Sequence, residues 1–186
     1  MDTYKGIWVF VETEQGYTQK VSYELISKGK ALAEEKKCRM TAVVIGSDID
    51  AVIGEAAAYG ADQIIAVDAP VYEYYSTDGY AVTMTELIRK YRPETVLIGA
   101  TDNGRDLAPR IACALQTGLT ADCTGIGIDA KTGCIAWTRP TFGGNLMATI
   151  ICPTERRWEQ FVRECLRQAF MKKRKKEKYL KRRNVK

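Results

Sequence analysis

The sequence contains no histidine among its 186 residues. This absence excludes Ser-His-Asp triads, histidine-activated cysteine nucleophiles, imidazole acid–base catalysis and histidine metal ligands, and with them the common hydrolase classes. Its six cysteines include no CxxC pair, and in a large domain without secretion features such thiols are expected to stay reduced. Because free cysteine packs as a small hydrophobic residue, we expect buried, structural thiols at Cys38, Cys113, Cys123, Cys134, Cys152 and Cys165.

Long apolar runs are also missing. No segment approaches the ~18–20 uninterrupted apolar residues that span a bilayer, and the opening MDTYKGIWVFVE lacks the basic start and small-residue cleavage site of a signal peptide. We therefore expect a cytoplasmic protein without a membrane partner. The 46% hydrophobic content can supply a full core, and the length predicts one domain of about 150 residues followed by an extension.

The formal net charge of +5 is unevenly distributed along the chain. Residues 172–186 contain ten Lys or Arg and one Glu, whereas the preceding residues contain 18 basic and 22 acidic side chains. The body is thus mildly acidic and the tail strongly basic. Ten clustered cations would bind polyanions, nucleic acid included, without sequence specificity and with strong salt dependence.

Short apolar runs alternate with segments whose apolar residues recur every three or four positions. The continuous apolar run at 6–11 is typical of a strand covered on both faces. The alternation predicts an α/β domain: a Rossmann-like, doubly wound, mostly parallel sheet with helices on both faces and antiparallel additions after residue 119. The expected strands are 6–11, 41–45, 63–67, 95–99, 119–128, 134–139 and 147–152, and the expected helices are 20–36, 49–59, 79–91 and 106–115.

The segment 101–105 (TDNGR) lies where such folds bind ligands, between the carboxyl end of a strand and the start of a helix. Free backbone N–H groups and the helix dipole favour anions at this point. One interpretation is therefore an anion or nucleotide subsite formed by the Gly104 backbone and Arg105. The sequence has neither a GxGxxG nor a GxxxxGK[ST] motif, so a dinucleotide or P-loop fingerprint is missing.

A purely structural interpretation of the same segment is favoured. In it, Asp102 or Asn103 caps the helix, and Arg105 and Arg110 pair with Asp106 or with a neighbouring subunit. No acid–base pairing is apparent for two further carboxylates, for which solvated or capping roles are expected: Asp122 and Asp129.

Adjacent glycines at 142–145 (FGGN) predict a hairpin turn, because glycine accepts positive φ at little steric cost. Arg139 precedes this turn and would place a guanidinium at the rim of the sheet. It could contact a flavin, a nucleotide or an acidic partner surface, or form a surface ion pair worth ~0–1 kcal/mol.

Two blocks resemble the N-terminal domain of the electron transfer flavoprotein alpha subunit: GATDNGRDLAPRIACALQTGLTADCT at 99–124 and TRPTFGGNLMATIICP at 138–153. The opening YKGIWVFVETEQGYTQKVSYELISKGKALA and AYGADQIIAVD at 58–68 are similar as well, so the resemblance covers about 4–153. The opening segment is most similar to the anaerobic-bacterial branch, some members of which bifurcate electrons from NADH.

The resemblance implies a Rossmann-like domain that packs against a beta subunit, in a heterodimer that carries electrons by flavin from acyl-CoA dehydrogenase or similar redox partners to an acceptor. The family's FAD belongs mainly to a C-terminal domain that this chain does not reach, so no FAD is expected on this chain alone. No catalytic residue or metal ligand is implied. Within the shared blocks, the candidate cofactor contacts are Arg105, Arg139, Gly143, Gly144 and Asn145, and the candidate subunit contacts are Arg105, Arg110, Arg139 and Asn145.

The resemblance ends near 153, so we divide the chain into a family domain, 1–153, and a helical, basic tail, 154–186. Helical spacing of Trp158, Phe161 and Cys165 predicts a helix over 158–169. One permitted set of codons for 156–169, read in the neighbouring frame with one C restored, encodes the family continuation PQMGTVRPGVFKAS. Our hypothesis is that a one-base slip near Glu155 created this C-terminus, which sequencing the gene would test.

Two other classes of function stay open from sequence alone. One is a free-standing nucleotide-binding α/β domain, which shares the predicted layout. The other is a nonspecific nucleic-acid-binding protein that acts through residues 172–186.

Overall fold

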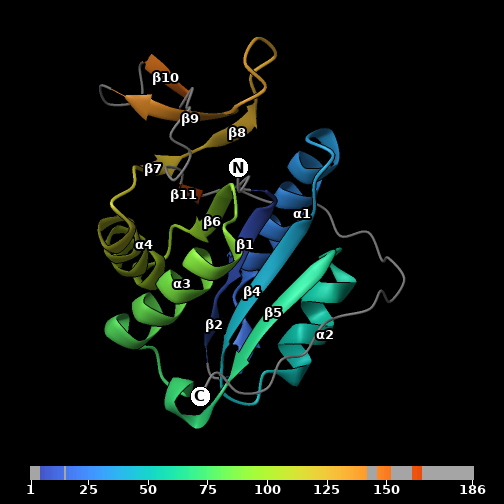
Figure 1. Ribbon diagram of the computed structural model, residues 1–186, viewed down its shortest axis with the longest axis vertical. Helices are drawn as coiled ribbons and strands as arrows, with labels where there is room; N and C mark the ends of the chain where they lie inside the picture. Colours follow the sequence, from blue (N-terminus) through green and yellow to red (C-terminus); the bar gives the residue numbers. More distant parts are fainter. Residues whose placement is uncertain (1–4, 15, 142–145, 152–160, 165–186) are drawn as a thin grey trace.

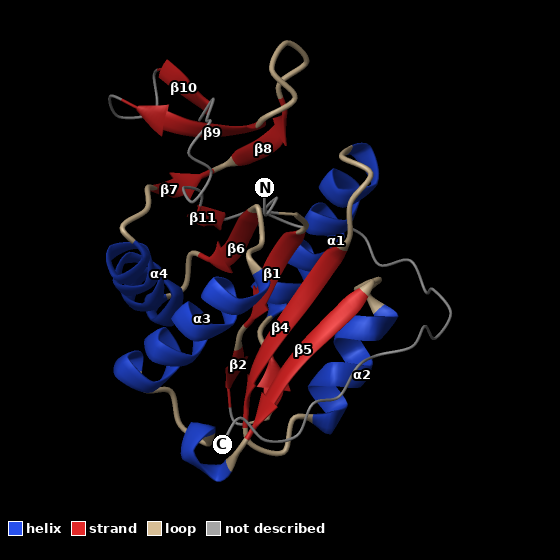
Figure 2. Ribbon diagram, viewed as in Figure 1, coloured by secondary structure: helices blue, strands red, loops and turns tan. Residues whose placement is uncertain are grey.

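The computed structural model describes residues 5–14, 16–141, 146–151 and 161–164. A six-stranded sheet lies at its centre, and every pair of neighbouring strands in it is parallel (Figures 1 and 2). From one edge to the other, the strands are β5 (Gln63–Asp68), β4 (Met40–Gly46), β1 (Ile7–Val11), β6 (Thr95–Gly99), β11 (Phe161–Glu164) and β7 (Leu119–Cys123).

Helices cover both faces of this sheet, as Figure 2 shows. Helices α1 (Lys20–Glu35) and α2 (Asp50–Ala58) pack on one hydrophobic core, and α3 (Thr77–Tyr91) and α4 (Asp102–Leu115) pack on the other. Every residue of β1, β4 and β6 is buried, as their continuous apolar sequences predict. The prediction of a doubly wound α/β fold is confirmed.

The order of the strands creates one switch point. The chain proceeds outward from β1 through β4 to β5, then returns to place β6 on the other side of β1. The connections after β1 and β6 therefore diverge to opposite faces of the sheet, and a crevice at the carboxyl ends of these two strands is where ligands bind in open α/β sheets.

A second, antiparallel sheet has the order β10-β9-β8 and is drawn above the main sheet in Figure 1. It comprises β8 (Gly125–Ile128), β9 (Ile135–Thr141) and β10 (Leu146–Ile151). Its buried Trp137 joins the core beneath α1 and α2. Antiparallel additions after residue 119 are thereby confirmed.

The prediction of one strand over 119–128 is wrong in one respect. The segment is divided at Thr124, so that β7 belongs to the parallel sheet and β8 to the antiparallel sheet. Asp122 has a left-handed φ of 55°, and the Thr124 N–H donates to the Thr138 carbonyl. The chain thus leaves one sheet and enters the other within three residues.

Two small elements were not predicted. A hairpin of β2 (Thr13–Glu14) and β3 (Tyr17–Thr18) precedes α1, and a 3-10 turn, η1 (Pro70–Tyr72), precedes α3. Glu55 of α2 accepts a hydrogen bond from Thr18 of the hairpin and another from Tyr23 of α1. Two-residue strands are too short to show a periodic pattern.

The tail helix expected over 158–169 is wrong where the structure describes this span. Residues 161–164 form β11, which lies between β6 and β7 and is parallel to both. A strand in this place satisfies backbone groups of two neighbours at once, which a helix cannot do. The remainder of the tail lies outside the described residues.

Candidate functional site

The switch point is built around the start of α4, one turn earlier than the sequence predicted. Its cap is Thr101, not Asp102 or Asn103: the Thr101 Oγ1 accepts a hydrogen bond of 3.0 Å from the Gly104 N–H. The helix can begin here because Gly104 has no side chain, since a Cβ on it would lie 2.0 Å from the Gly99 carbonyl oxygen. Helix α4 therefore lies directly against the end of β6.

Glu12, the residue after β1, occupies the other side of this crevice. Its side chain is buried, with 6% of the residue exposed. Thr101 donates from Oγ1 to Glu12 Oε2 at 2.6 Å, and Asn103 donates from Nδ2 to Glu12 Oε1 at 3.2 Å. Burial raises the pKa of the Glu12 carboxyl above its usual range, and these two hydrogen bonds oppose the rise.

The backbone of Glu12 is equally well held, by the start of α1. The Glu12 N–H donates to Ser22 Oγ at 2.9 Å, and the Glu12 carbonyl accepts from the Gln19 N–H at 2.9 Å. The residue thus links the first turns of two helices that cover opposite faces of the sheet, and its carboxylate is fixed in the crevice between them.

Arg105 does not complete an anion subsite at the switch point. Its guanidinium pairs with Asp122 at 3.2 Å, and both side chains are more than half exposed. Arg110 pairs with Asp78 of α3 at 2.8 Å. Asp106 accepts hydrogen bonds from Tyr75 and Thr77, and the pairing of these arginines with a neighbouring subunit stays a prediction.

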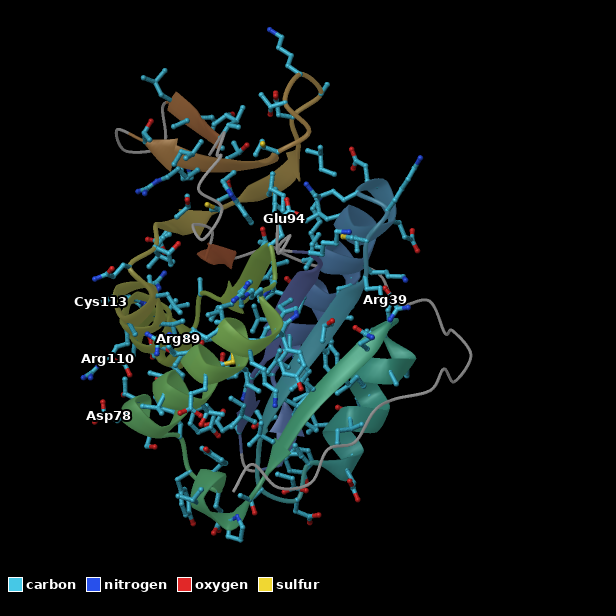
Figure 3. The ribbon with its side chains drawn as sticks, viewed as in Figure 1. Arg39, Asp78, Arg89, Glu94, Arg110 and Cys113 are labelled. Atoms are coloured by element: carbon cyan, nitrogen blue, oxygen red, sulfur yellow. The ribbon has the colours of Figure 1, made fainter. Side chains whose placement is uncertain are left out.

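A shallow, mainly apolar groove of about 630 Å³ lies between α3 and α4. Figure 3 shows Asp78, Arg89, Arg110 and Cys113 along these two helices. Arg110 and Asp78 form an ion pair at the groove, and Arg89 donates to the Ala114 carbonyl at 3.0 Å.

Arg139 lies on β9, on the same face as the fully buried Trp137 two residues earlier. The Arg139 Nε and the Trp137 Nε1 are shielded from solvent, and neither has a hydrogen-bond acceptor among the residues that the structure describes. Buried donors of this kind normally have a partner. Gly143, Gly144 and Asn145, which the sequence placed in the adjacent turn, lie outside the described residues.

Exposed apolar side chains follow on β10. Leu146 is 59% exposed and Met147 57% exposed. The pairing of Leu146 with Thr141 and of Ala148 with Arg139 puts Leu146 on the same face as Trp137 and Arg139. Burial on this face therefore decreases from Trp137 to Leu146. Met147 pairs with Pro140 and lies on the opposite face of the sheet. We call Arg139 and Leu146 the β9–β10 surface.

The model of the electron transfer flavoprotein domain matches residues 7–157 of the chain. The electron transfer flavoprotein subunit alpha of Clostridium acetobutylicum is 48% identical over 153 residues, which are 82% of this chain and 46% of the relative. The chain belongs to the electron transfer flavoprotein family.

Other relatives agree with this assignment. The electron transfer flavoprotein subunit alpha of Thermoanaerobacterium thermosaccharolyticum is 47% identical over 156 residues, 84% of this chain and 47% of the relative. The acryloyl-CoA reductase electron transfer subunit beta of Anaerotignum propionicum is 38% identical over 175 residues, 82% of this chain and 48% of the relative. The chain spans about half the length of these relatives, and the resemblance inferred from its sequence motifs is confirmed.

The electron transfer flavoprotein assignment raises the question of whether the described residues suit FAD. At the switch point they do not. A dinucleotide bound there would bring its pyrophosphate to the turn between β1 and α1, where Glu12 is buried and its N–H is already bonded to Ser22 Oγ. A second negative charge beside a buried carboxylate would be repelled.

Some features of this electron transfer flavoprotein domain could not be found from sequence. Glu12 looked like an ordinary strand end, and its partners lie about 90 positions later in the chain. The cysteine prediction was only partly right: the four described cysteines are free and Cys123 is buried, but Cys113 is exposed. Asp129 has the expected capping role, accepting from the Thr132 N–H at 2.8 Å.

Proposed function

We propose that this chain is a scaffold and subunit-interaction domain of a flavin-based electron carrier, acting with an electron transfer flavoprotein beta subunit rather than catalysing a reaction itself. The family match over residues 7–157 carries this proposal. The relatives are electron transfer flavoprotein subunits, and their matched half is this domain. The match does not favour a free-standing nucleotide-binding domain or a nucleic-acid-binding protein.

The β9–β10 surface is the part of the domain best suited to meet the beta subunit. Arg139 presents a shielded Nε donor without an acceptor among the described residues, on the same face as the exposed Leu146. An arginine next to exposed apolar surface is typical of the parts of an interface that contribute most to binding. Arg105 and Arg110 are weaker candidates because each already has an acidic partner.

The family's FAD is, in this proposal, held by protein outside this domain. The carboxylate of Glu12 in the switch-point crevice supports this assignment. No helix among the described residues is long and apolar enough to cross a membrane. We place the carrier in the cytoplasm, exchanging electrons with acyl-CoA dehydrogenase or a similar enzyme, with nucleic acid bound only nonspecifically through residues 172–186.

Co-expression with the beta subunit of the same genome tests the proposed function. We expect the two chains to purify together, and Arg139→Ala to weaken the complex by about tenfold or more because a desolvated donor is lost. The control is Arg39→Ala, an exposed arginine that Figure 3 shows on another side of the molecule. Failure of the wild-type chain to bind any beta subunit would contradict the proposal.

A flavin absorption spectrum of the purified material tests whether this chain or its partner holds the flavin. The chain alone should carry no flavin, and calorimetry with FAD, AMP or ATP should give no tight binding. Flavin bound stoichiometrically to the isolated chain would contradict the scaffold assignment.

A further inference from the structure

We propose that Glu12 determines what the switch-point crevice can hold: its carboxylate takes the anion position at the start of α4 and thereby excludes an external anion such as a nucleotide phosphate. The proposed function uses Glu12 only as support for FAD being held elsewhere, and the role of this residue in the crevice goes beyond it. It does not depend on whether the chain binds a beta subunit.

The hydrogen-bond pattern around Glu12 is the first observation. A helix start offers donors to an anion, and here the first turn of α4 serves Glu12 through two of its side chains. Thr101 connects the two parts directly, because its hydroxyl accepts from the Gly104 N–H and donates to the Glu12 Oε2. The Glu12 carboxylate therefore already uses the two side-chain donors at the start of α4 that an external anion would need.

The close packing of the crevice is the second observation. Gly104 has the Gly99 carbonyl against it, and a Cβ on Gly99 would lie 2.8 Å from Val21 Cγ1 of α1. Two helices and the end of β6 thus meet where only glycine fits. In such folds a glycine often lets the backbone come close to a phosphate. Here the glycines instead let α4 and α1 come close to the end of β6.

The burial of Glu12 is the third observation. Only 6% of the residue is exposed, and a carboxylate in such a place is costly unless it is hydrogen-bonded. The neighbouring groups that act on it electrostatically, Glu14 and Asp102, are acidic, and they raise its pKa further. The positive end of the α4 dipole favours negative charge, and this effect stabilises the Glu12 carboxylate despite its acidic neighbours.

Removing the carboxylate should turn the crevice into an anion site, which Glu12→Ala tests with formate as the probe. At a formate concentration about ten times its Kd, we expect the Tm of this variant to rise by about 3–6 °C over chloride at equal ionic strength. The Gly104 amide resonance should shift with the same saturation curve. Glu14→Ala is the matched control, since Glu14 is exposed and lies two residues away.

The wild-type chain, Glu14→Ala and Glu12→Gln should show no saturable response, since the first two keep the carboxylate and the amide of the third fills the same space. If Glu12→Ala is unfolded in chloride, recovery of folded protein in formate becomes the readout. An equal response of all variants, or no response of Glu12→Ala in formate, would overturn the proposal.

Discussion

The switch point and the antiparallel sheet both contain buried polar groups, but they differ in how many of these groups have hydrogen-bond partners. At the switch point, a carboxylate, a helix cap and an asparagine amide satisfy one another. On the antiparallel sheet, Arg139 and Trp137 present shielded donors that no described residue accepts from. A position that ligands use in many related folds is closed here, while a face of the added sheet offers unused donors and an exposed apolar side chain.

The comparison teaches that fold alone does not locate function. The order β5-β4-β1-β6 would by itself direct attention to the crevice between β1 and β6. The side chains there show an internally complete arrangement, whereas those of β9 and β10 do not.

The largest loss of stability at the switch point is expected for a substitution at Gly104. Gly104→Ala would place a Cβ 2.0 Å from a backbone oxygen that cannot move without displacing β6. We expect a loss of about 3 kcal/mol or more in the free energy of unfolding, measured by urea denaturation. Gly127→Ala, where nothing lies within 4 Å, is the control and should change stability by less than about 0.5 kcal/mol. Equal losses of stability in the two variants would show that α4 does not depend on the close contact between Gly104 and the Gly99 carbonyl.

Removal of the cap should have the next largest effect. Thr101→Ala deletes the acceptor for the Gly104 N–H and the donor to Glu12, for an expected loss of about 1–2 kcal/mol. Thr101→Ser keeps both functions of the hydroxyl and should retain most of the stability. Chemical denaturation of the two variants compares them directly, and a serine variant as unstable as the alanine one would assign the effect to the methyl group instead.

A smaller effect should appear as a dependence on pH. Because the folded pKa of Glu12 is raised, the folded chain holds a proton that the unfolded chain has lost at pH values just above 4.5. This contribution to stability is complete below the unfolded pKa and is lost as pH rises through the folded pKa. Glu12→Gln cannot titrate, so the stability of wild type relative to this variant should fall as pH rises from about 4.5.

Urea denaturation of both chains between pH 4 and 7 measures that difference. The two chains differ only at residue 12, so contributions from all other residues largely cancel in the comparison. A relative stability that rises with pH over this interval would contradict the raised pKa.

The smallest effect is expected for the ion pair between Arg105 and Asp122. Both side chains are more than half exposed, so a double-mutant cycle with Arg105→Ala and Asp122→Ala should give a coupling energy of ~0–1 kcal/mol that decreases with salt. A coupling well above this range would mean that the pair helps to fix the bend at Asp122.

The sequence was sufficient for the parts of the fold that depend on local pattern. Apolar runs located β1 and β6, and a three-and-four-residue spacing located α1, with errors of at most one residue at the ends. It was insufficient where long-range contacts decide. Helix α4 starts one turn earlier in the chain than predicted. Thr101 contacts Glu12, and Gly104 packs against the end of β6, and neither contact is visible in the local sequence.

The candidate site was harder to predict than the fold for the same reason. Arg105 and Arg139 were identified as possible contacts, but their surroundings depend on which strands lie beside them. Asp122 meets Arg105 where the chain bends between β7 and β8, and the Nε of Arg139 has no acceptor among the described residues.

Hydrogen–deuterium exchange of the chain with and without its beta subunit tests the central contrast most directly. The account predicts slower exchange on binding within residues 135–141 and 146–151, and no change at residues 99–104, which are already internally bonded. Protection at 99–104 without protection of β9 and β10 would contradict it.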